Sequence, residues 1–334
     1  MCKRSTRRQF LGEVSAAAGI ALTGRPGCGE PGSADRSNAR PIPRVVVARD
    51  EAIAKGAMIE HRDTLRKMLD ASMQRLTGTP DASAAWRKFF RPADRIGIKV
   101  NTLGLSTHPV VVDAIVAGLR AAGVPAENIV IWDRFDVELA RAGYRLNRSA
   151  SGVRCRGTDS EQYGSGYQSR IESSGRIGSA FSRIVAEDVE ALISVPVLKD
   201  HNLAGVSLGL KNWYGAIHNP NKYHDRHCDP YVADVVSHRY IRSKWRLTVC
   251  DATRAQYNAG PQYHAAYAWP CGGLIVSHDV VAADAVAADL LETQRRVRGL
   301  KSLAEDNRPP KHIATAAARG LGEADLRNIE RIEL

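Results

Sequence analysis

The sequence predicts an α/β protein with two lobes, each built on a largely parallel sheet that helices flank. Two observations indicate this class. Apolar runs of strand length alternate along the chain with helical patterns, which is typical of βα units. Most of these runs also end in polar or charged residues, and in open parallel sheets ligands bind at the carboxyl ends of the strands. We therefore expect a site in a crevice at these strand ends.

The elements follow in order along the chain. The first part contains an apolar run at 44–50, strands at 95–101 and 128–133, and helices at 109–123 and 137–144. The second part contains buried strands at 190–199, 245–251 and 272–279, and helices at 280–292 and 312–322. Between 147 and 182 the periodicity fails, which predicts a surface excursion or a pair of irregular strands. This segment divides an N-terminal lobe, 44–146, from a C-terminal lobe, 183–334.

Residues 1–34 are typical of a twin-arginine signal peptide. Arg7 and Arg8 precede Phe10, Leu11 and a short apolar stretch rich in Ala and Gly. We expect export to the periplasm by the twin-arginine translocase and cleavage after Ala34. No permanent membrane anchor is expected, because the apolar stretch is too short to span a bilayer. Residues 35–43 then form a predicted tether.

The composition favours a small anionic partner. The chain has 47 Lys and Arg against 36 Asp and Glu, a formal net charge of +11. No nucleic-acid partner is expected, because aromatics make up 6% and no basic stripe carries interleaved aromatics. The six cysteines include no C-x-x-C pair, so their spacing predicts no iron–sulfur cluster. Disulfide pairing in the periplasm and lipid attachment at Cys28 stay open.

Residues 198–231, LKDHNLAGVSLGLKNWYGAIHNPNKYHDRHCDPY, carry the densest set of reactive side chains. Glycines here let backbone N–H groups approach an anion, and buried lysines either bind anions or act as bases. The predicted catalytic residues are Lys199, His201, Lys211 and His224. The predicted substrate-binding residues, most of them at strand ends, are Lys99, Asn101, Asp133, Asn212 and Asp251. For each single aspartate at a strand end, capping of the next helix is the competing interpretation.

Metal binding is a second interpretation of the same segment. His224 and His227 have H-x-x-H spacing, and either His218 or His201 would complete three ligands for iron, zinc or copper. Pro220 and the residues around it indicate a loop, so this spacing does not fix the geometry. The alternative is that these histidines act as acids and bases or form local hydrogen bonds.

Six sequence blocks, taken together and in order, resemble the domain-of-unknown-function 362 family. The blocks are IKVN, LKDH, GVSLGLKNWYG, YHDRHCDPYVADV, VCDATRAQYNAGP and SHDVVAADAVAADL. The resemblance maps the family's blocks onto Lys99, Asn101, Lys199, His201, Lys211, Asn212, His224, Asp251, Gly260, Pro261 and Asp284. Many members carry a ferredoxin-like cysteine cluster, which gives the family its iron–sulfur association. This chain lacks that cluster and resembles the exported branch. The resemblance implies no established reaction.

Three functions remain in competition. The first is an enzyme that acts on a small anionic substrate with Lys and His as acid–base groups, with or without a metal. The second is a metal-binding redox protein without an organic substrate. The third is a periplasmic anion-binding protein that needs the lysines and not the histidines. We expect the first, because several proton-transfer groups are predicted to meet at one sheet edge.

Overall fold

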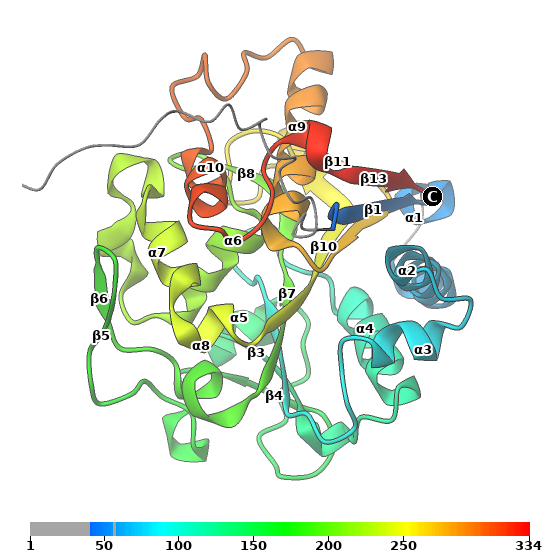
Figure 1. The fold of residues 1–334 in the computed structure, drawn as a ribbon, viewed down its shortest axis with the longest axis vertical. Coiled ribbons are helices and arrows are strands. Elements are labelled where there is room, and N and C mark those ends of the chain that lie inside the picture. The colour runs from blue at the N-terminus through cyan, green and yellow to red at the C-terminus, as the bar shows by residue number, and fades with distance from the viewer. Residues whose placement is uncertain (1–40, 56–57) are drawn as a thin grey trace, which may run out of the picture. The chain divides into compact units, whose positions relative to one another are not determined.

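The computed structural model describes residues 41–55 and 58–334 (Figure 1). The predicted signal peptide, 1–34, and residues 35–40 of the predicted tether lie outside the described residues. None of the helices in the described part of the chain is long and apolar enough to cross a membrane.

A large mixed sheet forms the centre of the fold. Its main path has the strand order β13-β1-β12-β10-β7-β2-β3-β4. The strands are β1 (Arg44–Arg49), β2 (Ile96–Val100), β3 (Ile129–Asp133), β4 (Arg154–Gly157), β7 (Ala191–Val195), β10 (Trp245–Gln256), β12 (Gly273–Ser277) and β13 (Glu330–Glu333). All neighbours from β10 to β4 are parallel, whereas β12 is antiparallel to both β1 and β10. The predicted α/β class with a mostly parallel sheet is therefore confirmed.

Strands from both expected lobes belong to this one sheet. β7, from the expected C-terminal lobe, pairs with β2, from the expected N-terminal lobe, with Lys99 opposite Ser194. β1 likewise pairs with β12, and residues 42–334 pack as one compact unit. The segment 147–182 contains β4, which pairs with β3 at the edge of the sheet, and then leaves the sheet to form a hairpin of β5 (Glu172–Ser174) and β6 (Ile177–Ser179). Its lack of periodicity reflects this irregular excursion.

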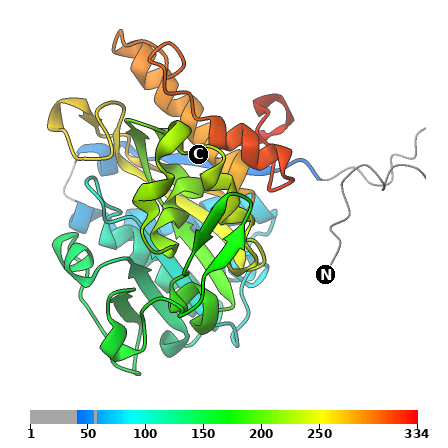
Figure 2. The same cartoon turned by 90° about the vertical axis from the view of Figure 1, so that its left-hand side faces the viewer.

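Helices cover both faces of the sheet (Figure 1). One face carries α2 (Arg62–Thr77), α3 (Ala82–Arg87) and α4 (Pro109–Ala121). The other carries α6 (Leu208–Asn212), α7 (Tyr231–Ser237), α8 (Arg239–Arg242), α9 (Val280–Val297) and α10 (Lys311–Ala318); Figure 2 looks onto this side, with the β5–β6 hairpin in front. Neighbouring strand residues alternate between the two cores, as Trp132 and Ile131 do. Burial on both faces explains why the strands are continuously apolar.

The remaining elements join or extend the sheet. α1 (Glu51–Lys55) follows β1, and α5 (Asp136–Arg141) follows β3. The predicted strand 190–199 is two strands, β7 and β8 (Val197–His201), because Pro196 lies between them and cannot donate a ladder hydrogen bond. β8 pairs with β10 and with β9 (Gly205–Val206), and β11 (Ala268–Trp269) pairs with β10. The described cysteines, Cys155, Cys228, Cys250 and Cys271, are free thiols.

Candidate functional site

A cavity of about 390 Å³ lies at the carboxyl ends of β2 and β3, beside β8 and α6. The predicted residues that line it are Lys99, Asn101, Asp133, Lys199, His201, Lys211, Asn212 and His224. The cavity therefore brings together side chains that lie more than a hundred residues apart in the sequence. Asp251, His218 and His227 are not part of its lining.

Lys99 and Asp133 form a buried ion pair in the wall of the cavity. Nζ of Lys99 lies 2.6 Å from Oδ1 of Asp133 and also donates to the backbone oxygen of Val100. Oδ2 of Asp133 accepts the backbone N–H and the hydroxyl of Thr102, both at 2.9 Å. A Cβ atom on Gly215 would lie 2.6 Å from Cε of Lys99, so only glycine fits against this pair. Because every charge here has partners, the pair holds the two strand ends together.

Lys199 anchors the loop that follows β2. Its Nζ donates to Oδ1 of Asn101 at 2.9 Å, to the backbone oxygen of Leu105 at 2.8 Å and to the backbone oxygen of Leu103. Burial lowers the pKa of Lys199 to about 7. A protonated lysine has three N–H donors, and all three have oxygen acceptors here. The role that these contacts support is to position the loop 101–105.

Lys211 lies beside His224 and has few other partners. Its Nζ is 3.0 Å from Nε2 of His224 and 4.7 Å from the centre of the Tyr214 ring. Nδ1 of His224 lies 3.2 Å from the backbone oxygen of Pro220, which can only accept, so Nδ1 carries the proton and Nε2 accepts from Lys211. Burial lowers the pKa of Lys211 to about 8 and that of His224 to about 4.

His201 is held in the opposite tautomer. Its Nδ1 accepts the backbone N–H groups of Leu203 at 3.1 Å and Ala204 at 3.3 Å, so the ring proton lies on Nε2. Burial lowers the pKa of His201, and the positive charge of Lys211 adds to that effect, so the ring is neutral. The rings of His201 and His224 are stacked with their centres 5.6 Å apart. A donor and an acceptor thus stand next to each other in the cavity wall.

The short helix α6 carries Lys211 and Asn212, and a buried carboxylate fixes its start. Asp284, on α9, accepts the backbone N–H groups of Gly209 and Leu210, each at 2.8 Å. A Cβ atom on Gly209 would lie 2.9 Å from Oδ1 of Asp284, which explains the glycine. Asn212 donates from Nδ2 to the backbone oxygen of Lys99 at 3.1 Å and so joins α6 to β2.

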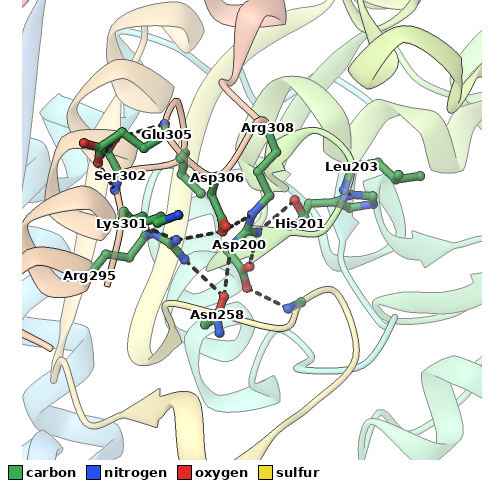
Figure 3. Close-up of polar contacts among 12 residues, drawn as sticks. Asp200, His201, Leu203, Asn258, Arg295, Lys301, Ser302, Glu305, Asp306 and Arg308 are labelled. Carbon is green, nitrogen blue, oxygen red and sulfur yellow. Dashed lines mark hydrogen bonds and ion pairs between the residues drawn. The ribbon is translucent and has the colours of Figure 1, made fainter. Parts of the chain in front are cut away.

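A second polar network holds β8 at Asp200 (Figure 3). The buried Asp200 accepts the backbone N–H of Gly260 at 2.7 Å and pairs with Arg308 at 2.6 Å. Arg308 also contacts Asp306 and Asn258, each at 2.9 Å, and both of these contact Arg295. This network fixes the strand residue that lies between Lys199 and His201. Sequence reasoning missed it, because Arg308 lies more than a hundred residues away in an irregular segment.

Arg134 and Glu138 also line the cavity and were not predicted. Arg134 directly follows Asp133 at the end of β3, so the rule that located Asp133 would have located it too. Nε of Arg134 is buried and has no hydrogen-bond partner among the described residues. Glu138, on α5, accepts the hydroxyl of Thr102 at 3.2 Å. The cavity lining thus includes a guanidinium group that the sequence analysis did not predict.

The comparisons with known proteins identify the family. The family model described as "Domain of unknown function (DUF362)" matches residues 96–289, which is more than half of the chain. The chain belongs to this family. The matched range contains all residues that line the cavity. No curated protein and no solved structure matches the chain.

Three predicted site residues of this DUF362 chain lie elsewhere. Asp251 accepts the backbone N–H groups of His108 at 2.8 Å and Thr253 at 2.9 Å, and it lies within β10 rather than before a helix. His218 is exposed and contacts Tyr167 through the ring edge. Nδ1 of His227 donates to the backbone oxygen of Leu203 at 3.1 Å.

The histidines predicted as metal ligands do not lie on one helical face. His227 has a left-handed backbone with φ of 61°, so the H-x-x-H spacing of the DUF362 chain does not have helical geometry. Over the described ranges, no three His, Cys, Asp or Glu side chains are grouped for a metal ion. A transition metal at His224, His227 and His218 stays a prediction of the sequence.

Proposed function

We propose that this DUF362 protein is an enzyme that carries out acid–base chemistry on a small anionic substrate in the cavity. One observation carries the proposal. Nε2 of His201 bears a proton, whereas Nε2 of His224 is an acceptor that faces Lys211 at 3.0 Å, and the two rings are stacked. A neutral donor and a neutral acceptor in one cavity are what general acid–base catalysis requires.

The charges in the cavity support an anionic substrate. The cationic side chains in the lining are Lys99, Lys199, Lys211 and Arg134, and the carboxylates are Asp133 and Glu138, which gives 4 − 2 = +2. Lys99 and Lys199 already have oxygen partners. Lys211 and Arg134 are therefore the cations that remain to bind a carboxylate or phosphate.

The roles follow from the contacts. The pair of Lys211 and His224 acts as the base, and a lysine with a pKa of about 8 supplies both protonation states near neutral pH. The Nε2–H of His201 donates a hydrogen bond to the oxygen on which negative charge develops. This combination supports removal of a proton from a carbon next to a carboxylate or carbonyl group.

We further propose that the enzyme works in the periplasm. The twin arginine at Arg7 and Arg8 supports export and a place in an exported branch of the family. The cysteine spacing supports the absence of the ferredoxin-like cluster. A resident metal is not needed for the roles given to His201, His224 and Lys211.

Hydrogen exchange with solvent tests the proposal. The full chain is incubated in D₂O with a panel of 2-hydroxy, 2-oxo and 2-amino carboxylates and three-carbon phosphates, and NMR follows deuterium at carbon. We expect exchange by the wild type on at least one compound and a loss of about 100-fold or more in His201→Ala. His218→Ala is the matched control, because His218 comes from the same segment and lies outside the cavity.

Each other outcome contradicts the proposal. Full exchange by His201→Ala would remove His201 from the chemistry. Tight binding of a panel compound without exchange, lost in Lys211→Met and kept in His201→Ala, would make the protein an anion-binding protein. Neither exchange nor binding across the panel would remove the small anion as substrate.

A further inference from the structure

We propose that Lys211 is a nucleophilic amine that forms an imine with the substrate, and that the substrate class is a small oxo acid. This inference deepens the proposed function and rests on it. It depends on how the three buried lysines of the cavity differ in their partners, and on the unpaired guanidinium N–H of Arg134.

Two of the three lysines are fully engaged. Nζ of Lys99 contacts Oδ1 of Asp133 and the backbone oxygen of Val100, each at 2.6 Å, and Oδ1 of Asn212 at 3.3 Å. Nζ of Lys199 has three oxygen acceptors, and all of them lie in the loop 101–105. Because oxygen acceptors occupy all three N–H bonds of each ammonium group, neither Nζ has a direction open to a substrate carbonyl.

Lys211 differs from both. In the part of the chain that the structure describes, its one hydrogen-bond partner is a nitrogen, Nε2 of His224 at 3.0 Å, and the face of Tyr214 covers another side. Lys211 is 8% exposed and lines the cavity, so its remaining N–H directions are open to a small ligand. Within residues 41–55 and 58–334 no carboxylate pairs with this ammonium group, and an acceptor nitrogen lies within hydrogen-bond distance of it.

Burial, and not a neighbouring charge, shifts the pKa of Lys211. Burial lowers its pKa to about 8, and the Cys228 thiol, whose own pKa burial raises, is the one titratable group that opposes this shift. Lys211 in turn lowers the pKa of His201, His224 and His312, so these rings are neutral when it is charged. A neutral amine is therefore accessible near neutral pH, which imine formation requires.

The proposed step balances with the groups present. Lys211 passes one ammonium proton to Nε2 of His224, and the free amine attacks the carbonyl carbon of the substrate. A second amine proton moves to the carbonyl oxygen, and the Nε2–H of His201 donates a hydrogen bond to that oxygen meanwhile. The proton held on His224 then moves to the same oxygen. The bond between the former carbonyl carbon and this oxygen breaks, and the oxygen leaves as water. The product is the protonated imine, with one N–H retained on Lys211.

Arg134 indicates that the substrate carries a carboxylate as well as a carbonyl group. Arg134 lines the same cavity, and its buried Nε has no hydrogen-bond partner among the described residues. An unpaired buried guanidinium N–H is costly unless a ligand satisfies it, and a carboxylate is the ligand whose geometry fits. A molecule that carries both a carbonyl group and a carboxylate would engage Lys211 and Arg134 together.

Reductive trapping tests the inference. The full chain at pH 8 is treated with limiting formaldehyde and cyanoborohydride, and separately with pyruvate and cyanoborohydride, and modified lysines are located by peptide mass spectrometry. We expect Lys211 to react with formaldehyde about tenfold or more faster than the exposed Lys222, because more of its amine is neutral at pH 8. Lys99 and Lys199 should stay unmodified, because oxygen acceptors surround Nζ of each and leave no open direction for the aldehyde.

Pyruvate separates carboxylate recognition from amine reactivity. The pyruvate adduct should form at Lys211, disappear in Lys211→Arg and persist in the control Lys222→Arg. Arg134→Ala should lower the yield with pyruvate about tenfold and leave the yield with formaldehyde unchanged. The wild-type labelling pattern needs no variant, so it tests the inference even if Lys211→Arg folds poorly.

The failures of the inference and of the proposed function are distinguishable. If Lys211 reacts no faster than Lys222, or if pyruvate labels exposed lysines instead, the imine is overturned. If Lys211→Arg then still exchanges substrate hydrogen with D₂O, the acid–base function stands without the imine. If that exchange is absent from the wild type as well, the proposed function fails too.

Discussion

Nζ of Lys99 lies 2.6 Å from Oδ1 of Asp133, and both side chains are almost completely buried. Lys211 is also buried in the same cavity and has no carboxylate partner among the described residues. Lys99 therefore stabilises the fold through its ion pair, whereas the unpaired charge of Lys211 does not stabilise it. Uncompensated charges of this kind are typical of functional sites and lower the free energy of unfolding.

Replacing these two lysines should have opposite effects on stability. Lys99→Met leaves the carboxylate of Asp133 buried without its cation and should lower the free energy of unfolding by about 3–5 kcal/mol. Lys211→Met removes a buried charge and should be neutral or raise it by on the order of 1 kcal/mol. Chemical denaturation at pH 7 measures both. A large loss in Lys211→Met would contradict this distinction.

The effect of Lys211 on stability should depend on pH. Its pKa is about 8 in the folded chain and about 10.4 in the unfolded chain, so between these values the unfolded chain binds more protons. Stability contributed through this group is therefore lowest below pH 8 and rises toward pH 10. Between pH 8 and pH 10 the unfolding free energy of the wild type should therefore rise by about 2–3 kcal/mol relative to that of Lys211→Met. A constant difference would exclude the lowered pKa.

Gly215→Ala should disrupt the wall of the cavity. Its Cβ would lie 2.7 Å from Nζ of Lys99 and 2.8 Å from Oδ1 of Asp133, so the ion pair must move. We expect a loss of about 1–3 kcal/mol in unfolding free energy. Gly178→Ala is the matched control, because the nearest atom to its Cβ would be 3.6 Å away. Equal stabilities for the two variants would show that the close approach at Gly215 is not needed.

Asp284→Asn should loosen the helix that carries Lys211. The amide keeps one acceptor and places an N–H₂ group against a backbone N–H of Gly209 or Leu210. The expected loss is about 1–3 kcal/mol in unfolding free energy, with faster amide exchange at residues 209 and 210. Asp289→Asn serves as the control, because Asp289 lies on α9 as Asp284 does but on the exposed side of that helix. Unchanged amide exchange in Asp284→Asn would mean that α6 does not depend on this carboxylate.

The network around Asp200 and Arg308 gives a further test. Arg308→Met leaves the carboxylate of Asp200 buried and unpaired, which should cost about 3–5 kcal/mol. Adding Asp200→Asn should recover part of this loss, because the buried charge is then gone. Thermal unfolding of the two single variants and the double variant measures the coupling. Strict additivity would show that Arg308 and Asp200 do not interact.

The fold and the site differ in how far the sequence predicts them. Apolar strand runs such as 128–133 are visible because burial on both faces leaves no polar positions until the strand ends. Lys99, Asp133 and Lys199 were predicted as site residues because each lies near the end of such an apolar run. What pairs with these lysines depends on which strands become neighbours, and nothing in the local pattern shows that β7 would lie next to β2.

The errors have physical causes of the same kind. Pro196 divides the predicted strand 190–199 into β7 and β8. The single proline could have indicated this division, but the apolar run continues past it and predicts one strand. Pro220 and its neighbours indicated a loop around the histidines, and the left-handed backbone at His227 agrees with that prediction. Long-range partners such as Arg308 and Asp284 have no local signal, because their roles depend on contacts that only the folded chain makes.

His201 carries its ring proton on Nε2, whereas Nε2 of His224 is an acceptor that faces Lys211. ¹⁵N NMR of the histidine rings in the full chain at pH 7 measures this directly, with assignments from His201→Ala and His224→Ala. We expect two neutral rings, with the proton on Nε2 of His201 and on Nδ1 of His224, unchanged down to about pH 5. A charged ring at pH 7, or the same tautomer in both residues, would contradict it.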